Sequence, residues 1–205
     1  MRLDADPGHL ASIAAHLAVW HGGMLDAESK GDAQGFYEPA LPRLFGQESS
    51  KGVAVSSERV ASGQDRFGEH HGLGVSVLDF KLSTAETNVS LFIVENSFHE
   101  KGGPARHLHH DQDEWFYALE GEFRFEIGEQ RLTLKPGDSV LGPRRVPHVW
   151  AYTGGGVGRM LVAFAPAGKM EAFFREITKA NAMPPQDPAL WRAYGMELVG
   201  PPLRV

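Results

Sequence analysis

The 205-residue sequence contains no cysteine. This absence excludes disulfide bonds and thiolate metal sites. Long apolar runs are also missing, and no stretch approaches the roughly 20 residues that cross a bilayer as a helix. Asp4 and Asp6 stand where a signal peptide needs positive charge. We therefore expect a cytoplasmic protein without a membrane partner.

Charge of one sign is not concentrated anywhere along the chain. The 20 basic and 26 acidic residues give a formal net charge of −6, and no long block of either sign occurs. Nucleic-acid-binding proteins need a clustered basic face, so we expect no nucleic-acid partner. Hydrophobic residues make up 42% of the sequence, which is enough for a core in one domain with appendages.

Short strand patterns dominate the sequence from about residue 51. They combine alternating or continuous apolar residues with β-branched side chains, and turn residues separate them. We expect strands at 53–55, 74–82, 88–96, 105–109, 114–119, 122–127, 130–135, 138–142, 147–152 and 159–164. No long helical pattern interrupts this series, which excludes a parallel βαβ sheet and indicates a sandwich or barrel.

Helical patterns flank these strands on both sides. Apolar residues fall on one face at helical spacing in 6–21 and again in 169–180, and 188–194 begins with Pro188 after a capping Asp187. Residues 22–50 are rich in Gly, Pro, Ser and Asp and resemble a linker. The predicted domains are an N-terminal helix and arm at 1–50, a barrel at 51–168 and a C-terminal helical extension at 169–205.

The residues that carry chemistry concentrate in the stretch GGPARHLHHDQDEWFYALEG, residues 102–121. His107 and His109 are two positions apart and point to the same face of a strand. Glu114 adds a carboxylate and His148 a further imidazole. Imidazoles with one carboxylate suit Fe, Mn, Ni, Co, Cu or Zn, whereas Ca and Mg prefer oxygen ligands. We predict that these four side chains bind one divalent transition metal; alternatively, Glu114 orients a ligand histidine from outside.

A two-residue turn at Glu120-Gly121 predicts a hairpin over 114–127. Its opposed residues share one side of the sheet, and the three inward pairs are Glu114 with Ile127, Phe116 with Phe125, and Ala118 with Phe123. Trp115, Tyr117 and Leu119 face the other way and need a cover, because large exposed apolar patches usually mark contacts. The helix at 169–180 is one candidate cover and a second subunit is the other; we predict a homodimer.

Five further side chains are candidates for contacting a small-molecule substrate. Two lie on the inward face of the predicted hairpin, two share the face of His148, and one precedes His148 in a loop where it can bind a carboxylate bidentately. Core packing is the alternative for the aromatic residues, and a surface or intersubunit salt bridge is the alternative for the arginine. The candidates are Phe116, Phe125, Trp150, Tyr152 and Arg144.

The stretch 102–121 and the segment GPRRVPHVW resemble the two motifs of the cupin superfamily. The first motif matches at His107, His109, Glu114 and Gly121, and the second matches at Gly137, Pro143 and His148. Arg145 and Tyr152 replace the usual glycine and asparagine of the second motif. The resemblance implies an all-β fold, a double-stranded β-helix or jelly-roll barrel, here with short N-terminal and C-terminal helices. The segments look most like single-barrel bacterial cupins related to quercetin dioxygenases.

This resemblance implies a metal-dependent dioxygenase that acts on a small oxygenated aromatic or enol. The expected metals are Fe, Ni or Mn, with Zn, Co and Cu as alternatives, and Glu114 would act as both ligand and catalytic base. Three histidines and one carboxylate leave coordination positions open, which is typical of catalytic sites. A non-redox isomerase or lyase, and a binding protein without turnover, are the alternatives, because one fold hosts many chemistries.

Overall fold

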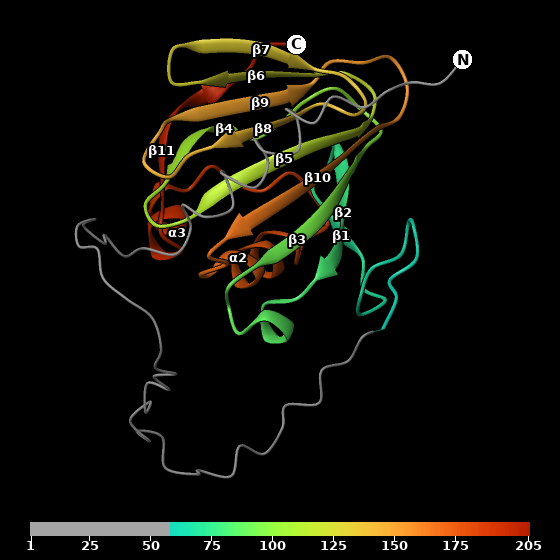
Figure 1. Ribbon diagram of the computed structural model, residues 1–205. Helices are drawn as coiled ribbons and strands as arrows, with labels where there is room; N and C mark the ends of the chain where they lie inside the picture. The colour runs from blue at the N-terminus through green and yellow to red at the C-terminus, as the bar shows by residue number, and fades with distance from the viewer. Residues whose placement is uncertain (1–57) are drawn as a thin grey trace, which may run out of the picture. The chain divides into compact units, whose positions relative to one another are not determined.

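The computed structural model describes residues 58–205, which form two antiparallel β-sheets and two short α-helices (Figure 1). In sheet order, the six-stranded sheet contains β1 (His71–Gly72), β2 (Ser76–Leu82), β3 (Phe92–Phe98), β10 (Gly158–Ala165), β5 (Asp113–Glu120) and β8 (Ser139–Gly142). The five-stranded sheet contains β11 (Met196–Pro202), β4 (Ala105–His109), β9 (His148–Tyr152), β6 (Phe123–Ile127) and β7 (Gln130–Leu134). This arrangement confirms the predicted all-β jelly-roll barrel. The predicted helix at 6–21, the arm at 22–50 and the strand at 53–55 lie outside the described residues.

Most predicted strands occur close to their predicted bounds, with three differences. The two-residue strand β1 at His71–Gly72 was not predicted. The strand predicted at 88–96 begins only at Phe92, because the chain first forms the 3-10 helix η2 (Thr84–Thr87), which Ser83 caps. Residues 196–202 form β11 and pair with β4, although they were predicted to belong to a helical extension. The C-terminal segment therefore contributes to the barrel itself.

The predicted pairing of β5 with β6 is wrong. β5 lies between β10 and β8 in one sheet, while β6 lies between β9 and β7 in the other. The turn at Gly121 is an arch between the two sheets, with a φ of 82° at which glycine is favoured. The predicted facing of the side chains is nevertheless right: Phe116 and Phe125 are fully buried, and their ring centroids meet at 4.9 Å across the interior.

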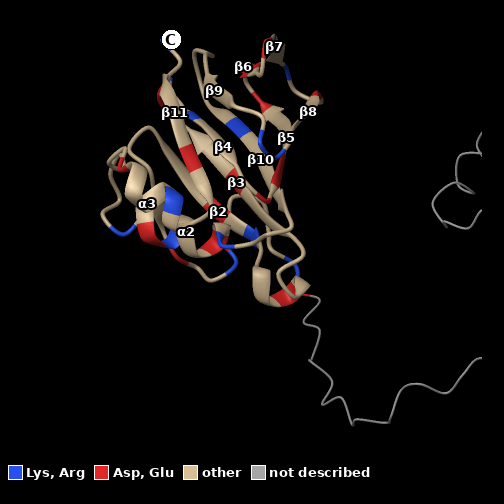
Figure 2. Cartoon of the chain, turned by 90° about the vertical axis from the view of Figure 1, so that its left-hand side faces the viewer, with Lys and Arg blue, Asp and Glu red and all other residues tan. Residues whose placement is uncertain are grey.

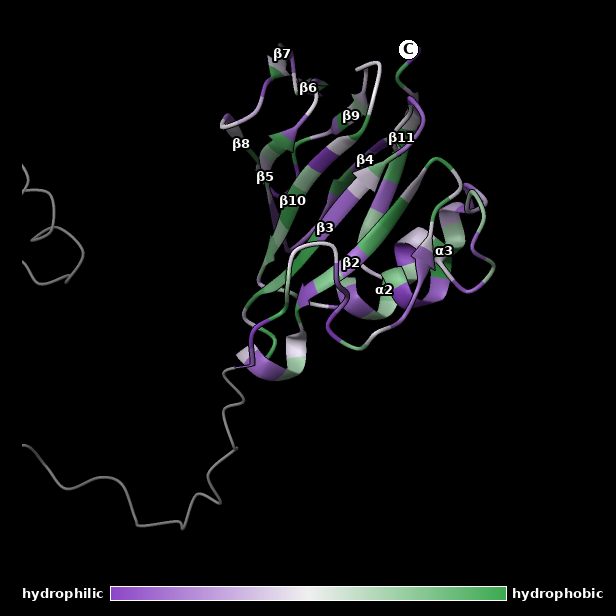
Figure 3. Cartoon of the chain, turned by 90° about the vertical axis from the view of Figure 1, so that its right-hand side faces the viewer, coloured by the Kyte–Doolittle hydropathy of each residue, from purple (hydrophilic) through white to green (hydrophobic). Residues whose placement is uncertain are grey.

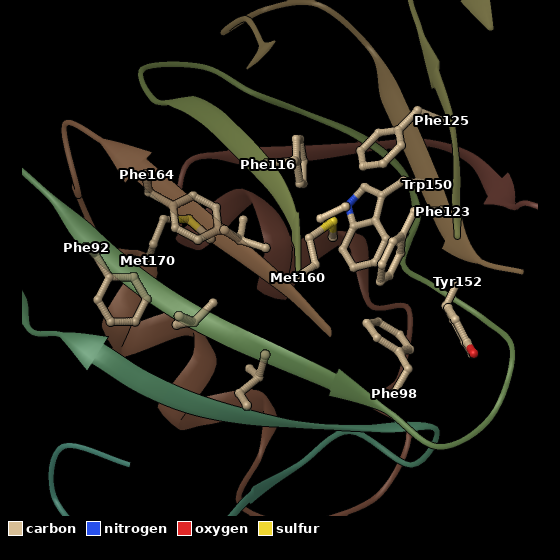
Figure 4. Close-up of a cluster of buried hydrophobic side chains, with 14 of the residues drawn as sticks. Phe92, Phe98, Phe116, Phe123, Phe125, Trp150, Tyr152, Met160, Phe164 and Met170 are labelled. Carbon is tan, nitrogen blue, oxygen red and sulfur yellow. The ribbon is translucent and has the colours of Figure 1, made fainter. Parts of the chain in front are cut away.

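Aromatic side chains from both sheets fill the interior of the barrel. Figure 4 shows Trp150 lying among Phe116, Phe123, Phe125 and Phe98. The strands supply this core because buried and less buried side chains largely alternate along β2, β3 and β10, which carry many hydrophobic residues (Figure 3). Burying one such side chain contributes about 1.5–3 kcal/mol, so the packed faces are the main source of the barrel's stability.

Two helices, α2 (Met170–Ile177) and α3 (Pro188–Ala193), confirm the helical patterns at 169–180 and 188–194 with shorter bounds. Phe174 of α2 packs against Phe92 and Phe164, with ring centroids 6.1 and 5.6 Å apart, so α2 covers the inner face of the six-stranded sheet. The helix therefore does not cover the outward residues of β5, where Trp115 remains 38% exposed.

Charged residues of both signs are interspersed over the strands and helices in Figure 2. No helix within residues 58–205 is long and apolar enough to cross a membrane.

Candidate metal centre

The four predicted metal ligands meet inside the barrel. His107 and His109 extend from β4, His148 from the neighbouring β9, and Glu114 from β5 of the other sheet. All four are at most 4% exposed. The Oε2 atom of Glu114 lies 3.8, 3.2 and 2.9 Å from the Nε2 atoms of His107, His109 and His148, and the ligand atoms all lie within 4.8 Å of one another. The structure thus brings together every predicted ligand.

Hydrogen bonds to the backbone fix the orientation of two of the imidazoles. His107 Nδ1 donates to the carbonyl oxygen of Ala105 at 2.8 Å, and His148 Nδ1 donates to that of Val146 at 3.0 Å. When these imidazoles are neutral, their Nε2 atoms therefore carry lone pairs that face the carboxylate of Glu114. These lone pairs and the negatively charged carboxylate of Glu114 repel one another. A cation or a proton must therefore lie between the imidazoles and Glu114.

The electrostatics of the cluster favour charged Glu114 beside neutral His107. Burial raises the pKa of Glu114, but its interactions with His107, His109 and His148 outweigh this and hold it well below its usual value. Burial lowers the pKa of His107 to about 4, although its interaction with Glu114 opposes the shift. An ionised carboxylate and a neutral imidazole are the forms that bind a metal.

His109 is the member whose environment fits a metal best. Its side chain is 1% exposed, and neither ring nitrogen has a hydrogen-bond partner among residues 58–205. A buried polar atom without a partner costs about 1–3 kcal/mol. A cation held by all four side chains would satisfy His109 and remove the repulsion around Glu114, so these residues fit one divalent transition metal.

A cavity of about 570 Å³ adjoins the cluster, and His107, His109 and Glu114 form part of its wall. The remaining wall is mainly apolar and comes from β2, β3, β10, α2, α3 and the C-terminal segment. Trp191 of α3 also lines the cavity and packs edge-on against the ring of His107, at 5.0 Å between centroids. The ligand cluster therefore opens onto a space large enough for a small molecule.

Besides the two ring nitrogens of His109, three buried polar atoms belong to residues of the cavity wall and lack hydrogen-bond partners within the described part of the chain. They are Asn96 Oδ1, Trp150 Nε1 and Trp191 Nε1. Sequence reasoning missed Asn96 and Trp191. Asn96 appeared only as the end of an apolar strand, and Trp191 belonged to a short helix whose position depends on tertiary packing. Residues of the cavity wall therefore carry one acceptor and two donors whose hydrogen bonds are unsatisfied.

Among the predicted substrate contacts, the structure places only Trp150 at the cavity wall. Phe116, Phe125 and Tyr152 are at most 1% exposed and lie in the aromatic core. The hydroxyl of Tyr152 points away from the labelled cluster in Figure 4 and accepts the N–H of Gly156 at 3.0 Å. Their placement corresponds to the alternative of core packing.

Arg144 is also placed away from the cavity wall. Its guanidinium donates to both carboxylate oxygens of Asp113, at 3.0 and 2.7 Å. Hydrogen bonds from Arg144 lower the pKa of Asp113 to about 2, and the same pairing raises the pKa of Arg144. This is the surface salt bridge that the sequence left open as the alternative to substrate binding.

Comparison with solved structures finds distant similarity. The KdgF structure from Halomonas sp. has 19% identity over 52% of this chain and 94% of its own, with a TM-score of 0.44. An RmlC-like cupin from Shewanella frigidimarina has 23% identity over 57% of this chain and 96% of its own, also at 0.44. A predicted oxalate decarboxylase from Thermotoga maritima has 17% identity, covering 47% and 90%, at 0.43. Similarity at this level identifies no substrate.

The sequence itself matches a protein family over the region of the candidate site. No curated protein matches the chain significantly. Residues 96–164 match the family model described as Cupin domain, and this range includes His107, His109, Glu114 and His148. Residues 96–164 therefore resemble a cupin domain, and the four converging side chains within this range are candidate metal ligands.

Proposed function

We propose that this protein is a metal-dependent oxidoreductase of the dioxygenase type that acts on a small oxygenated aromatic or enol. The observation that supports the proposal best is the cluster of three histidines and Glu114 at the wall of a largely apolar cavity of about 570 Å³. Such a cavity suits a flat, mostly apolar molecule that enters with one oxygenated edge toward the ligands.

The composition of the cavity favours this substrate class over a sugar or sugar acid, which the alternative isomerase or lyase would bind. Each hydroxyl group buried without a hydrogen-bond partner costs roughly 1–3 kcal/mol. The unpartnered polar atoms of the wall, on Asn96, Trp150 and Trp191, suffice for a molecule with few oxygens. A polyhydroxylated sugar would bury more polar groups than these three atoms satisfy.

Glu114 is the proposed general base, because it is ionised and adjoins the cavity. Its carboxylate stays ionised despite complete burial, because the histidines lower its pKa. In that state it can accept the proton of a substrate hydroxyl. When bound, Fe, Ni or Mn would act as a Lewis acid that stabilises the negative charge of the deprotonated substrate oxygen. The metal would also supply the redox capacity that reaction with dioxygen requires. The indole N–H groups of Trp150 and Trp191 would donate to substrate oxygens and orient the ring.

The proposal is tested by metal analysis and oxygen consumption on protein purified without chelator or nickel affinity resin. We expect about one transition metal per chain and oxygen uptake with some members of a panel of flavonols and catechols. Glu114→Gln should abolish the uptake, while Glu129→Gln, in an exposed turn, serves as the matched control. A metal-loaded protein that consumes no oxygen with any member of the panel would refute the dioxygenase assignment.

A further inference from the structure

A second group of potential metal ligands lies outside the cavity wall. Asp65 and Glu69 belong to the loop that precedes β1, and His71 begins β1. His71 Nε2 lies 3.4 Å from Glu69 Oε2 and 3.8 Å from Asp65 Oδ2, and one ligand atom from each residue lies within 4.8 Å of the others. Nothing in the sequence pattern assigned a role to these three residues.

The tautomer of neutral His71 is set by a chain of two hydrogen bonds. The hydroxyl of Thr178 donates to the carbonyl oxygen of Phe174 at 2.7 Å, so its oxygen is left to accept. His71 Nδ1 therefore donates its proton to Thr178 Oγ1, which lies 3.1 Å away. The Nε2 atom of neutral His71 then carries a lone pair that faces two carboxylates.

This Nε2 atom is otherwise unsatisfied. His71 is 5% exposed, and Nε2 has no hydrogen-bond partner among residues 58–205. A buried lone pair directed at two carboxylate oxygens is unfavourable unless a cation or a proton lies between them. The two carboxylates would balance the charge of one divalent cation.

The carboxylates are held in a way that allows them to bind a cation. The side chain of Asp65 is 3% exposed, and the backbone N–H groups of Phe67, Glu69 and Phe80 fix it at 2.8, 3.1 and 2.7 Å. Glu69 is 48% exposed and pairs with Arg175, which also binds Glu171 at 3.1 Å. Arg175 therefore keeps a carboxylate partner when Glu69 turns toward a cation.

We propose that Asp65, Glu69 and His71 form a second site for a divalent transition metal of the zinc type. Ligands about 2.1 Å from a tetrahedral zinc ion are separated by roughly 3.4 Å, which is close to the observed spacing around His71. Thr178 acts as the outer partner that orients the imidazole. Because Thr178 ends α2, and Phe173 and Phe174 of α2 line the cavity, the site would fix one wall of the cavity against the β1 edge of the sheet.

The test is a titration of the metal-free full-length chain with Zn²⁺, with Co²⁺ as a spectroscopic probe, up to two equivalents. The His107→Ala/His109→Ala variant, which lacks the cupin ligands, should still bind one equivalent, and that equivalent should disappear when His71→Ala is added. His71→Ala alone should bind one equivalent fewer than the parent. His70→Ala, at the exposed neighbouring histidine, is the matched control and should bind as the parent does.

Two further variants distinguish the loss of a metal ligand from misfolding of His71→Ala. Glu69→Gln changes a half-exposed ligand and should lose the second equivalent, with an unchanged far-ultraviolet circular dichroism spectrum. Thr178→Val keeps every ligand but removes the outer hydrogen bond, and it should weaken the second equivalent by about 10–100-fold. If the His107→Ala/His109→Ala variant binds no metal, or if His71→Ala and Glu69→Gln bind as much as the parent, the group holds only a proton and the proposal is wrong.

Discussion

Replacing Glu114 with glutamine in the metal-free protein tests the electrostatic account of the candidate metal centre. Without metal, neutral His148 presents a lone pair to Glu114 Oε2 at 2.9 Å, so this contact is favourable only when His148 is protonated. Accordingly, burial lowers the pKa of His148, but the hydrogen bond and charge of Glu114 raise it more strongly. A glutamine amide can accept from protonated His148 or donate to neutral His148.

The sign of the resulting pH dependence follows from this shift. The pKa of His148 is raised in the folded protein above the value of about 6.5 expected for the unfolded chain. His148 therefore stabilises the folded state fully when the pH is below the unfolded pKa, and this stabilisation is lost as the pH rises through the folded pKa. A hydrogen bond to a charged group contributes about 1.5–3 kcal/mol and a neutral one about 0.5–1.5 kcal/mol. Near pH 6 the metal-free parent should therefore be about 1 kcal/mol more stable than Glu114→Gln.

Toward about pH 9 the order of stability should reverse. The parent then retains a buried, ionised carboxylate without a proton partner, whereas the glutamine is uncharged. His107 contributes little to the difference, because its pKa of about 4 keeps it neutral in the folded protein over this range.

Urea denaturation in the presence of a chelator, followed by tryptophan fluorescence, measures both free energies of unfolding. The curves of stability against pH for the parent and Glu114→Gln should cross between about pH 6 and pH 9. Glu129→Gln should follow the parent. A constant difference between the parent and Glu114→Gln over the whole range would refute the proposed contact of His148 with Glu114.

Three further predictions concern the candidate metal centre and the assembly of the protein. His107→Ala and His109→Ala should each lose most of the bound metal. Their circular dichroism spectra should stay unchanged, because the apolar faces stabilise the barrel. Stoichiometric metal in both variants would exclude His107 and His109 as ligands. In the metal-loaded protein, Glu114→Gln should retain more metal than the histidine variants but lose turnover more severely, because an amide oxygen can coordinate a metal but accepts no proton. Unchanged turnover would show that Glu114 is not the general base. We also predict a homodimer through the exposed Trp115 face of β5, so sedimentation should give twice the mass of one chain, and Trp115→Asp should give a folded monomer or an insoluble protein. A one-chain mass for the parent at roughly tens of micromolar would exclude the dimer.

The parts of the fold that the sequence predicted best depend on local periodicity. The burial of the side chains alternates strictly along β4, ARHLH, which occurs at its predicted bounds of 105–109. The same alternation placed Glu114 and Phe116 on the interior face correctly. Strand partners depend instead on contacts between distant residues. A turn at Gly121 is compatible with a hairpin or with an arch, and only the packing of the whole barrel selects the arch.

β11 and the second candidate metal site were missed for related reasons. MELVGPP contains a glycine and two prolines, which argue against a strand, but β11 lies at the edge of its sheet, where proline is tolerated. The environment of His71 depends on Thr178, which is 107 positions away in the sequence. His71 follows a polar stretch of sequence and shows none of the same-face spacing that identified His107 and His109.

The position of Glu114 connects metal binding with folding. A carboxylate buried at 4% exposure among aromatic side chains costs several kcal/mol unless a cation compensates it. The surrounding imidazoles supply that cation only while they hold protons, and His107, with a pKa of about 4, holds none at neutral pH. A bound metal supplies the charge at any pH at which the histidines are neutral, and it binds the folded chain in preference to the unfolded chain. The arrangement that prepares Glu114 to accept a proton from substrate should therefore also make the barrel more stable when it is loaded with metal.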